Sequence, residues 1–216
     1  MSDAIKVDIW SDIACPWCYI GKRKFETAVT EFGEDVDVEY HAYELAPETP
    51  EEVVGTALQN FVERKGVPLE QAKEMFDRVI GVAKEVGLDY DYDSLQSTNT
   101  VRAHELLHYA KAHGRQIDMK ERLLRAYFIE GRHIGRVESL AELAGEIGLD
   151  RADALRALSS REFLSAVDAD KAQAREYGIQ GVPFFVIDGK YGISGAQNSS
   201  VFVEALQQVK GEKDAA

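Results

Sequence analysis

Cysteine is scarce in this sequence, which holds only Cys15 and Cys18 among its 216 residues. Two cysteines are too few for the disulfide framework of a small secreted domain. A chain of this length buries roughly 70% of its unfolded surface and needs no such staples to fold. In a reducing compartment, a close pair of cysteines is more often catalytic or metal-binding than structural. The scarcity therefore directs attention to this one pair.

Positive charge is also limited, because 25 Lys and Arg residues face 38 Asp and Glu residues and leave a formal net charge of −13. A protein that binds nucleic acid needs a basic surface that neutralises phosphates. The one compact basic cluster, Lys22-Arg23-Lys24, is balanced by Asp12 and Glu26 nearby in the sequence. The composition therefore predicts no nucleic-acid partner.

Long apolar runs are absent as well. No stretch reaches the roughly 18 to 20 apolar residues of a membrane span. The first six residues also lack the basic segment and apolar run of a secretory signal. With 45% hydrophobic and 29% charged residues, the composition is that of a soluble globular protein. We therefore expect a cytoplasmic protein with no membrane partner.

The amino-terminal part of the chain reads as a strand, a helix and a second strand. Residues 5–10 and 36–43 alternate apolar and polar side chains, which predicts two strands. A helix is expected between them, from Pro16 to Phe32. Proline favours a first helical position, and Gly33 suits the residue beyond a helix end.

The middle of the chain changes to a helical period. Capping boxes are predicted at Thr49–Glu52 and Ser159–Glu162, and glycines recur where helices would end. Helices are expected over 51–64, 69–86, 99–113, 118–131, 137–147, 151–158 and 161–177.

The carboxyl-terminal part returns to strands. Residues 182–187 and 190–194 predict a hairpin around Asp188-Gly189. A helix over 199–210 should follow, and the tail from Gly211 to Ala216 is expected to fray.

These patterns predict an α/β protein in which both ends of the chain build one sheet. Residues 1–44 and 165–216 would form that domain, and residues 45–164 an inserted all-helical domain. Crevices between domains are favoured sites for ligands. We therefore expect function where the helical domain overhangs the sheet.

The sequence Cys15-Pro16-Trp17-Cys18 places a Cys-x-x-Cys motif at the junction between strand and helix. Unpaired N–H groups at a helix start stabilise an anion, and thiols in such motifs have pKa values lowered from about 8.5 to roughly 3.5–7.5. We expect Cys15 to be exposed at the helix tip and to attack a disulfide. Cys18, one turn on, should face inward and resolve the mixed disulfide.

Two structural interpretations of the pair compete with this one. A structural disulfide that closes only four residues would remove little entropy from the unfolded chain. A structural zinc site needs four ligands, and the other two would have to come from distant histidines such as His104 and His108. Neither fits as well as a redox pair.

Val182-Pro183 comes just before an apolar strand. A cis bond here would kink the chain beside the cysteines, and Val182 could then pair with an extended substrate as in strand addition. Since only about 5–6% of such bonds are cis in folded proteins, the residues alone favour an ordinary trans proline at the start of a strand.

Several segments together resemble the FrnE-like branch of the DsbA family, over about residues 5 to 210. The two most specific are Cys-Pro-Trp-Cys and the Gly-Val-Pro-Phe-Phe of residues 181–185. The others are Ser11–Ala14, Tyr19–Gly21, Asn99–His104, Ala126–Phe128 and Ser194–Gln197. The resemblance implies a thioredoxin fold with an inserted helical domain, a thiol–disulfide site at Cys15 and Cys18, and a cis Pro183 facing them.

The same superfamily includes kappa-class glutathione transferases and 2-hydroxychromene-2-carboxylate isomerases. These carry a Ser-Pro-x-Ser type motif where this chain has Cys15, so the chain departs from them at the catalytic position. Asp12 and the segment Asn99–His104 are nonetheless shared in type with them. A glutathione-dependent isomerase or transferase is therefore the alternative function, and glutathione or another small thiol the alternative co-substrate.

Other residues near the motif are candidates for supporting roles. A buried Asp8 or Asp12 could take the proton of Cys18 during resolution, although a solvated or turn-capping carboxylate is the favoured interpretation of each. Trp17 should form an apolar rim for substrate, whereas Trp10 should pack on the sheet. Asn99 could be a helix N-cap only.

The segment His104-Glu105-Leu106-Leu107-His108 matches the His-Glu-x-x-His motif of zinc proteases. The metzincin extension would need Gly at 111 and His at 114, where this chain has Lys111 and Gly114. His133 could be only a distant third ligand. We therefore predict no metal site, and expect His104 to face the crevice and His108 to lie on a partly exposed side of its helix.

The sequence as a whole predicts a thiol–disulfide oxidoreductase without a bound cofactor. Cys15 and Cys18 would carry the chemistry, while Pro16, Trp17, Val182 and Pro183 would contact a protein or small-molecule thiol or disulfide. A cellular thiol would recycle the pair. In a reducing cytosol, reduction or isomerisation of disulfides is more natural than their formation, but potentials among relatives span about −270 to −120 mV, so the direction stays open and an oxidase of protein or small-molecule thiols is the other possibility.

Overall fold

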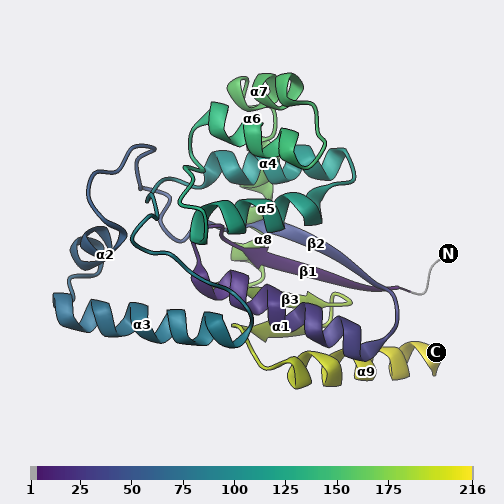
Figure 1. Cartoon of the computed structure of the whole chain (residues 1–216). Coiled ribbons are helices and arrows are strands. Elements are labelled where there is room, and N and C mark those ends of the chain that lie inside the picture. The colour runs from purple at the N-terminus through teal and green to yellow at the C-terminus, as the bar shows by residue number, and fades with distance from the viewer. Residues whose placement is uncertain (1–3, 216) are drawn as a thin grey trace.

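The computed structural model describes residues 4–215 and has a mixed α/β architecture. Four strands form one sheet in the order β2-β1-β3-β4 (Figure 1). β1 (Ile5–Ser11) pairs in parallel with β2 (Val36–Ala42). β3 (Phe184–Ile187) pairs antiparallel with both β1 and β4 (Tyr191–Ser194). Strands from the two ends of the chain thus share one sheet, which confirms the predicted fold class.

The helices connect and cover these strands. Within residues 4–215 they are α1 (Pro16–Phe32), α2 (Ala57–Lys65), α3 (Leu69–Glu85), α4 (Val101–Ala112), α5 (Gln116–Phe128), α6 (Val137–Glu146), α7 (Arg151–Ser159), α8 (Leu164–Glu176) and α9 (Ser199–Asp214). None of them combines the length and the hydropathy that a membrane span requires.

Helices α1 and α9 pack together beneath one face of the sheet (Figure 1). Phe25 of α1 and Phe202 of α9 meet Phe185 of β3, with ring centroids 5.4 Å and 4.6 Å from that of Phe185. All three rings are almost fully buried, and full burial of such a side chain stabilises the fold by about 1.5–3 kcal/mol. This packing fixes the amino end of α1 at the end of β1.

The opposite face of the sheet is covered by α8. Trp10 of β1 is 1% exposed and clusters there with Ala174 and Val186. Its indole N–H donates a hydrogen bond to the carbonyl oxygen of Asp170, at 3.1 Å. Trp10 therefore packs on the sheet, as predicted.

Helices α4 to α7 pack on one another beside β2 (Figure 1) and share a core that is separate from the one under α1 and α9. The side chain of Gln116 ties α5 to the edge strand. It accepts a hydrogen bond from the N–H of Tyr40 at 3.0 Å and donates one to the carbonyl of Tyr40 at 2.8 Å. This arrangement agrees with an inserted helical domain, while its boundaries at residues 45 and 164 stay a prediction.

Both predicted capping boxes are wrong. In place of the one predicted at Thr49–Glu52, Thr56 and Gln59 form a capping box, and α2 begins at Ala57 rather than at residue 51. The preceding residues are instead held to the loop before α4, where the Asn99 N–H donates to the carbonyl of Pro50. A contact 49 residues away in sequence thus overrides the local signal.

The second box fails because the chain turns within it. Arg161 has a positive φ of 59°, so the helix cannot continue through it, and α8 begins only at Leu164. At the carboxyl end the predicted fraying is also wrong, since α9 runs on to Asp214. Ala216 lies outside the described residues. β3 begins at Phe184, after Pro183, instead of at residue 182.

Candidate active site

Cys15 stands where the turn after β1 meets α1. It is the N-cap residue of the helix, with extended backbone angles of φ −92° and ψ 113°, and Pro16 follows at the first helical position. The Cys18 N–H donates to the carbonyl of Cys15 at 3.0 Å, so both cysteines lie at the first turn. N–H groups at a helix start favour a negative charge nearby. Both α1 boundaries and the placement of the pair confirm the sequence-based prediction.

The segment before β3 closes over the same helix end. The Val182–Pro183 peptide bond is cis, as the family resemblance implied and against the interpretation from spacing alone. The thiol of Cys15 donates to the carbonyl oxygen of Val182, with 3.5 Å between sulfur and oxygen. Gly21 lies close by, since a Cβ atom there would stand 3.0 Å from Cγ of Pro183. The fold thus brings together the residues that the sequence grouped as the site.

Both cysteines are buried, each with 3% of its surface exposed, and neither is in a disulfide. The prediction of an exposed Cys15 is therefore wrong for this state of the protein. Val182 approaches the sulfur. The hydroxyl of Tyr90 donates to the carbonyl of Pro16 at 2.7 Å, which holds the segment before α4 against the motif. Trp17 remains 38% exposed at the rim, as expected.

The two thiols titrate as a pair. Burial raises the pKa of Cys18, but the hydrogen bond from Cys15 and the nearby charge of Lys120 outweigh it and bring that pKa below its ordinary value. The hydrogen bond with Cys18, together with burial, holds the pKa of Cys15 well above its ordinary value. Because the two thiols titrate together, the pair releases its first proton more readily than its second. The expected lowering of the pKa of Cys15 is therefore not found, and the lowered pKa is that of Cys18.

Asp12, three residues before Cys15, is a buried anchor of the turn. Its Oδ1 accepts from the N–H of Ala14 at 3.4 Å and lies 3.3 Å from Nε2 of His104, and its Oδ2 accepts from the N–H of Leu45 at 2.8 Å. Although burial raises its pKa, these hydrogen bonds, that of His104 foremost, hold the pKa below the ordinary value. Asp12 is therefore an ionised turn-capping carboxylate that links the motif to α4.

The basic cluster of α1 does not use Asp12, contrary to expectation. The buried Lys22 forms ion pairs with Glu26 and with Glu121, the latter at 2.7 Å. Arg23 binds the same two carboxylates. The sequence could not show Glu121 as a partner, because it comes from α5, about a hundred residues further along the chain.

Asn99 serves the backbone around α4 and does not contact the cysteines. Its Oδ1 accepts from the N–H of Val101 at 2.8 Å, and its amide donates to the carbonyl of Pro47 at 3.0 Å. Thr100 is the N-cap residue but makes no side-chain cap. Asn99 therefore supplies the capping hydrogen bond from one position earlier.

The His-Glu-x-x-His residues lie on α4 but turn to three separate partners. His104 contacts Asp12, while Nε2 of His108 lies 2.8 Å from Oδ2 of Asp170. Glu105 faces Arg161, with 3.1 Å between Oε1 and Nε. His108 is 9% exposed, so the prediction of a partly exposed side is wrong. Within residues 4–215 these side chains do not converge on one point, as zinc ligands would.

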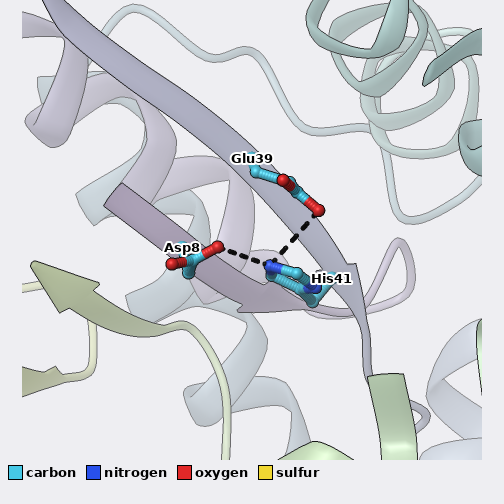
Figure 2. A group of neighbouring side chains, drawn as sticks. All are labelled: Asp8, Glu39 and His41. Carbon is cyan, nitrogen blue, oxygen red and sulfur yellow. Dashed lines mark hydrogen bonds and ion pairs between the residues drawn. The ribbon is translucent and has the colours of Figure 1, made fainter. Parts of the chain in front are cut away.

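Asp8 lies away from the cysteines, in a cluster with Glu39 and His41 on the β1–β2 pair (Figure 2). Nε2 of His41 lies 2.8 Å from Oδ1 of Asp8 and 3.7 Å from Oε1 of Glu39. Lys6 and Lys111 pair with these carboxylates. Despite burial, hydrogen bonds to Asp170 and Asp8 raise the pKa of His41 to about 9. A protonated imidazole and two ammonium groups therefore supply these carboxylates with the positive charge that a metal ion would bring.

Two residues near the cysteines escaped the sequence analysis. Lys120 of α5 is 0% exposed, and Tyr90, in the loop before α4, contacts Pro16. A signal for Lys120 was present, because helical spacing puts it on the face that carries Leu123 and Leu124. No comparable signal marks Tyr90, whose position depends on how the loop crosses the helix end.

The fold and the paired cysteines define the class of protein. The DSBA-like thioredoxin domain family matches residues 6–207. The chain therefore belongs to this family and has its thioredoxin-like fold. A crystal structure of a probable DsbA oxidoreductase from Streptomyces coelicolor has 38% sequence identity and a TM-score of 0.90, covering 96% of this chain and 91% of that one. Both comparisons support an enzyme of the thiol–disulfide oxidoreductase type.

Two more distant structures share the fold. A 2-hydroxychromene-2-carboxylate isomerase is 18% identical with a TM-score of 0.73, covering 98% of this chain and 99% of that one. The cytosolic disulfide reductase DsbM from Pseudomonas aeruginosa, solved with GSH, is 19% identical with a TM-score of 0.68, covering 95% and 99%. At these identities the likeness concerns the fold alone.

Proposed function

We propose that this protein reduces or isomerises disulfides, with Cys15 attacking and Cys18 resolving. The observation that carries the proposal is the contact between the Cys15 thiol and the carbonyl of Val182, beside cis Pro183. An extended substrate chain that pairs with Val182 would replace this contact and bring its own disulfide to Cys15. The exposed ring of Trp17 and the neighbouring Pro16 would supply apolar contact.

The reaction begins from a pair that holds one proton. That proton passes from Cys15 to Cys18, and the Cys15 thiolate attacks one sulfur of the substrate disulfide. The substrate S–S bond breaks, and the first leaving sulfur takes a proton from solvent. Cys18 then gives its proton to the second leaving sulfur and attacks Sγ of Cys15, which releases the second substrate thiol. Two electrons pass to the substrate, and the pair becomes a disulfide that a cellular thiol reduces again.

Asp12 and His104 would support the pair without exchanging protons with it. Their buried contact fixes the turn before Cys15, and the negative charge of Asp12 disfavours a second thiolate on Cys15. Asp8 has its hydrogen bond with His41, so we assign it no part in proton transfer. Asn99 would act only through the backbone that it caps.

We place this activity in the cytoplasm and among FrnE-like proteins, on the motifs of residues 11–21 and 181–186. Glutathione would be the small thiol that recycles the pair. Support comes from a shared fold with a cytosolic reductase solved with GSH. No other cofactor is required for exchange between thiols and disulfides.

Reduction of insulin by glutathione, with the purified protein as catalyst, tests this function. The wild-type protein should accelerate the reaction, whereas Cys15→Ser should lose that acceleration because its hydroxyl cannot form the mixed disulfide. Asn99→Ala, which leaves both cysteines in place, is the matched control. Equal turnover by wild type and Cys15→Ser would remove the proposal.

A glutathione-dependent isomerase is the second candidate, favoured by the fold shared with the 2-hydroxychromene-2-carboxylate isomerase. Such a reaction would need glutathione binding but no resolving thiol. Full isomerase activity in Cys18→Ala, together with no insulin reduction by wild type, would favour it over the redox function.

A further inference from the structure

Lys120 is a fully buried lysine of α5. The adjacent residue Glu121 accepts a hydrogen bond from Tyr19 and pairs at 2.7 Å with Lys22, one helical turn after Cys18, so this part of α5 packs on the first turns of α1. It is 0% exposed, and its Nζ has no hydrogen-bond partner within residues 4–215. The nearest aromatic group is the ring of Tyr40, whose centroid lies 5.3 Å from Nζ. An ammonium group without polar partners is costly to bury unless an opposite charge compensates it.

Opposite charge is available from α1 and the turn before it. The charges that favour protonated Lys120 are those of Cys18, Asp12 and Cys15, in falling order, while Lys22 opposes it. Tyr40 contributes only its ring, since burial keeps its pKa far above neutrality. Burial lowers the pKa of Lys120 to about 8. The amine can therefore gain or lose its proton near neutral pH.

The charge of Lys120 in turn favours a negative charge on the cysteine pair. Lys120 is the strongest of the fixed charges that favour a thiolate on Cys18. Asp12 cannot do this, because a carboxylate near the sulfurs repels a thiolate and already has its own partners in His104 and Leu45. Lys22 is occupied as well, in its ion pairs with Glu26 and Glu121.

We propose that Lys120 is a positioning residue of the cysteine pair, whose buried ammonium is the counter-charge of the shared thiolate and stabilises the reduced pair against the disulfide. The proposal rests on the function proposed above and names the group that sets its redox poise. A stabilised reduced form raises the reduction potential of the pair, which eases its re-reduction by the cellular thiol and limits how strongly it reduces a substrate disulfide.

The proton balance of the redox step follows from this role. When two thiol molecules reduce the Cys15–Cys18 disulfide, the small thiols form a disulfide and the pair receives two electrons. Of the two protons that the small thiols give up, one stays on the pair. The other goes to Lys120 if its amine is neutral, or to solvent if the amine is already protonated. When the pair is oxidised again, the thiolate disappears, and Lys120 loses its counter-charge and releases the proton more readily.

The test compares Lys120→Met, which keeps an unbranched side chain without charge, with Lys111→Met, which removes an exposed lysine from α4. Thiolate formation is followed by ultraviolet absorbance against pH, and the redox equilibrium is measured in glutathione buffers. In Lys120→Met the first thiolate should appear at a pH at least about one unit higher than in wild type. The equilibrium constant for forming the disulfide should rise about tenfold, which corresponds to about 30 mV. Lys111→Met should behave as wild type in both measurements.

If Lys120 had a purely structural role, its buried charge would be uncompensated. Its removal should then leave the reduced protein at least as stable to urea as wild type. Unchanged thiolate formation and redox equilibrium in Lys120→Met would overturn the proposal. If that variant does not fold, nitrogen NMR of wild type decides instead: the Lys120 amine should titrate at higher pH in the reduced protein than in the oxidised one. Equal titration in the two states would overturn the proposal.

These measurements need no substrate turnover, so the two proposals fail separately. A wild-type protein that does not reduce insulin but shows the Lys120 effect would refute the function and keep the counter-charge. A wild-type protein that reduces insulin, with Lys120→Met titrating identically, would refute the counter-charge and keep the function.

Discussion

The sulfur of Cys15 lies 3.5 Å from the carbonyl oxygen of Val182, although 167 positions separate the two residues in the sequence. This contact joins the start of α1 to the segment before β3, at the end of the sheet that both ends of the chain build. It places the thiol of Cys15 beside the backbone carbonyl that the proposed function assigns to substrate pairing. The predictions below follow from this arrangement and from the buried charges around it.

Removal of Cys18 should trap the first covalent intermediate. We expect Cys18→Ala, incubated with glutathione disulfide, to accumulate a glutathione adduct on Cys15, because no second thiol can displace it. Mass spectrometry of the peptide that contains the motif checks this result. In the converse variant, Cys15→Ala, the buried Cys18 should react with glutathione disulfide at least about tenfold more slowly than Cys15 does in Cys18→Ala. Faster modification of Cys18 in that variant would reverse the proposed roles.

The close approach of α1 to Pro183 predicts a penalty for Gly21→Ala. The new Cβ would stand 3.0 Å from Cγ of Pro183 and 3.4 Å from Cβ of Ala196, and overpacking costs about 1–3 kcal/mol. Alanine regains only about 0.5–1 kcal/mol as a better helix former. Urea unfolding should therefore show a net loss of roughly 1 kcal/mol, together with slower insulin reduction.

Gly81→Ala is the matched control for that variant. Gly81 lies inside α3, and a Cβ there meets nothing within 4 Å. Its substitution should stabilise the protein by about 0.5–1 kcal/mol and leave insulin reduction unchanged. If both alanine variants stabilise equally, the packing between α1 and Pro183 is looser than the structure indicates.

The buried ion pairs of His41 predict that stability falls at alkaline pH. Its pKa is raised from 6.5 to about 9, against the effect of burial, by hydrogen bonds to Asp170 and Asp8. A raised pKa adds stability that is fully present below pH 6.5 and is lost as pH rises through 9. Since one unit corresponds to about 1.4 kcal/mol, the loss should be on the order of 2–3 kcal/mol.

Because the pKa of Lys120 is about 8 and also falls within this window, the effect is measured as a difference. The unfolding free energy of wild type minus that of His41→Gln should shrink between pH 6.5 and pH 9. A difference that stays constant or grows across this window would contradict the assigned charge of His41.

The separate partners of His104 and His108 predict that the His-Glu-x-x-His sequence holds no zinc. The oxidised protein is the right sample, since its cysteines cannot bind metal as thiolates. Elemental analysis after purification without chelator should find no stoichiometric zinc in it. Added zinc should shift the unfolding temperature of wild type and His104→Ala by the same small amount. Stoichiometric zinc that His104→Ala loses would restore the metal interpretation.

The prediction of α1, which depends on neighbouring residues, is correct, whereas the first predicted capping box, which a distant contact overrides, is wrong. The bounds of α1 were correct, because Pro16 and Gly33 act within their own helix, and Gly33 has the left-handed φ of 73° that such an end requires. The capping box at Thr49 failed because a competing contact between Asn99 and Pro50 holds that segment. Local signals thus predict an element well only where no distant partner competes for its backbone.

The features of the candidate site also fall into two groups, those that local sequence indicates and those that distant elements determine. Its cysteines, Pro16 and Trp17 were identified from their spacing, and Pro183 from the motif around it. The burial of Cys15 and the presence of Lys120 and Tyr90 were not. These depend on α5 and on the loop before α4, whose positions over the motif no local pattern encodes.

The amino-acid sequence alone determined that a Cys-x-x-Cys motif stands at the start of a helix, because the two cysteines and the proline at the first helical position are neighbouring residues. The tertiary structure alone decided what surrounds the two sulfurs. Desolvation and long-range charge act through space, so the directions in which the pKa values of Cys15 and Cys18 are moved follow from groups that folding brings together, among them a lysine about a hundred positions further along the chain.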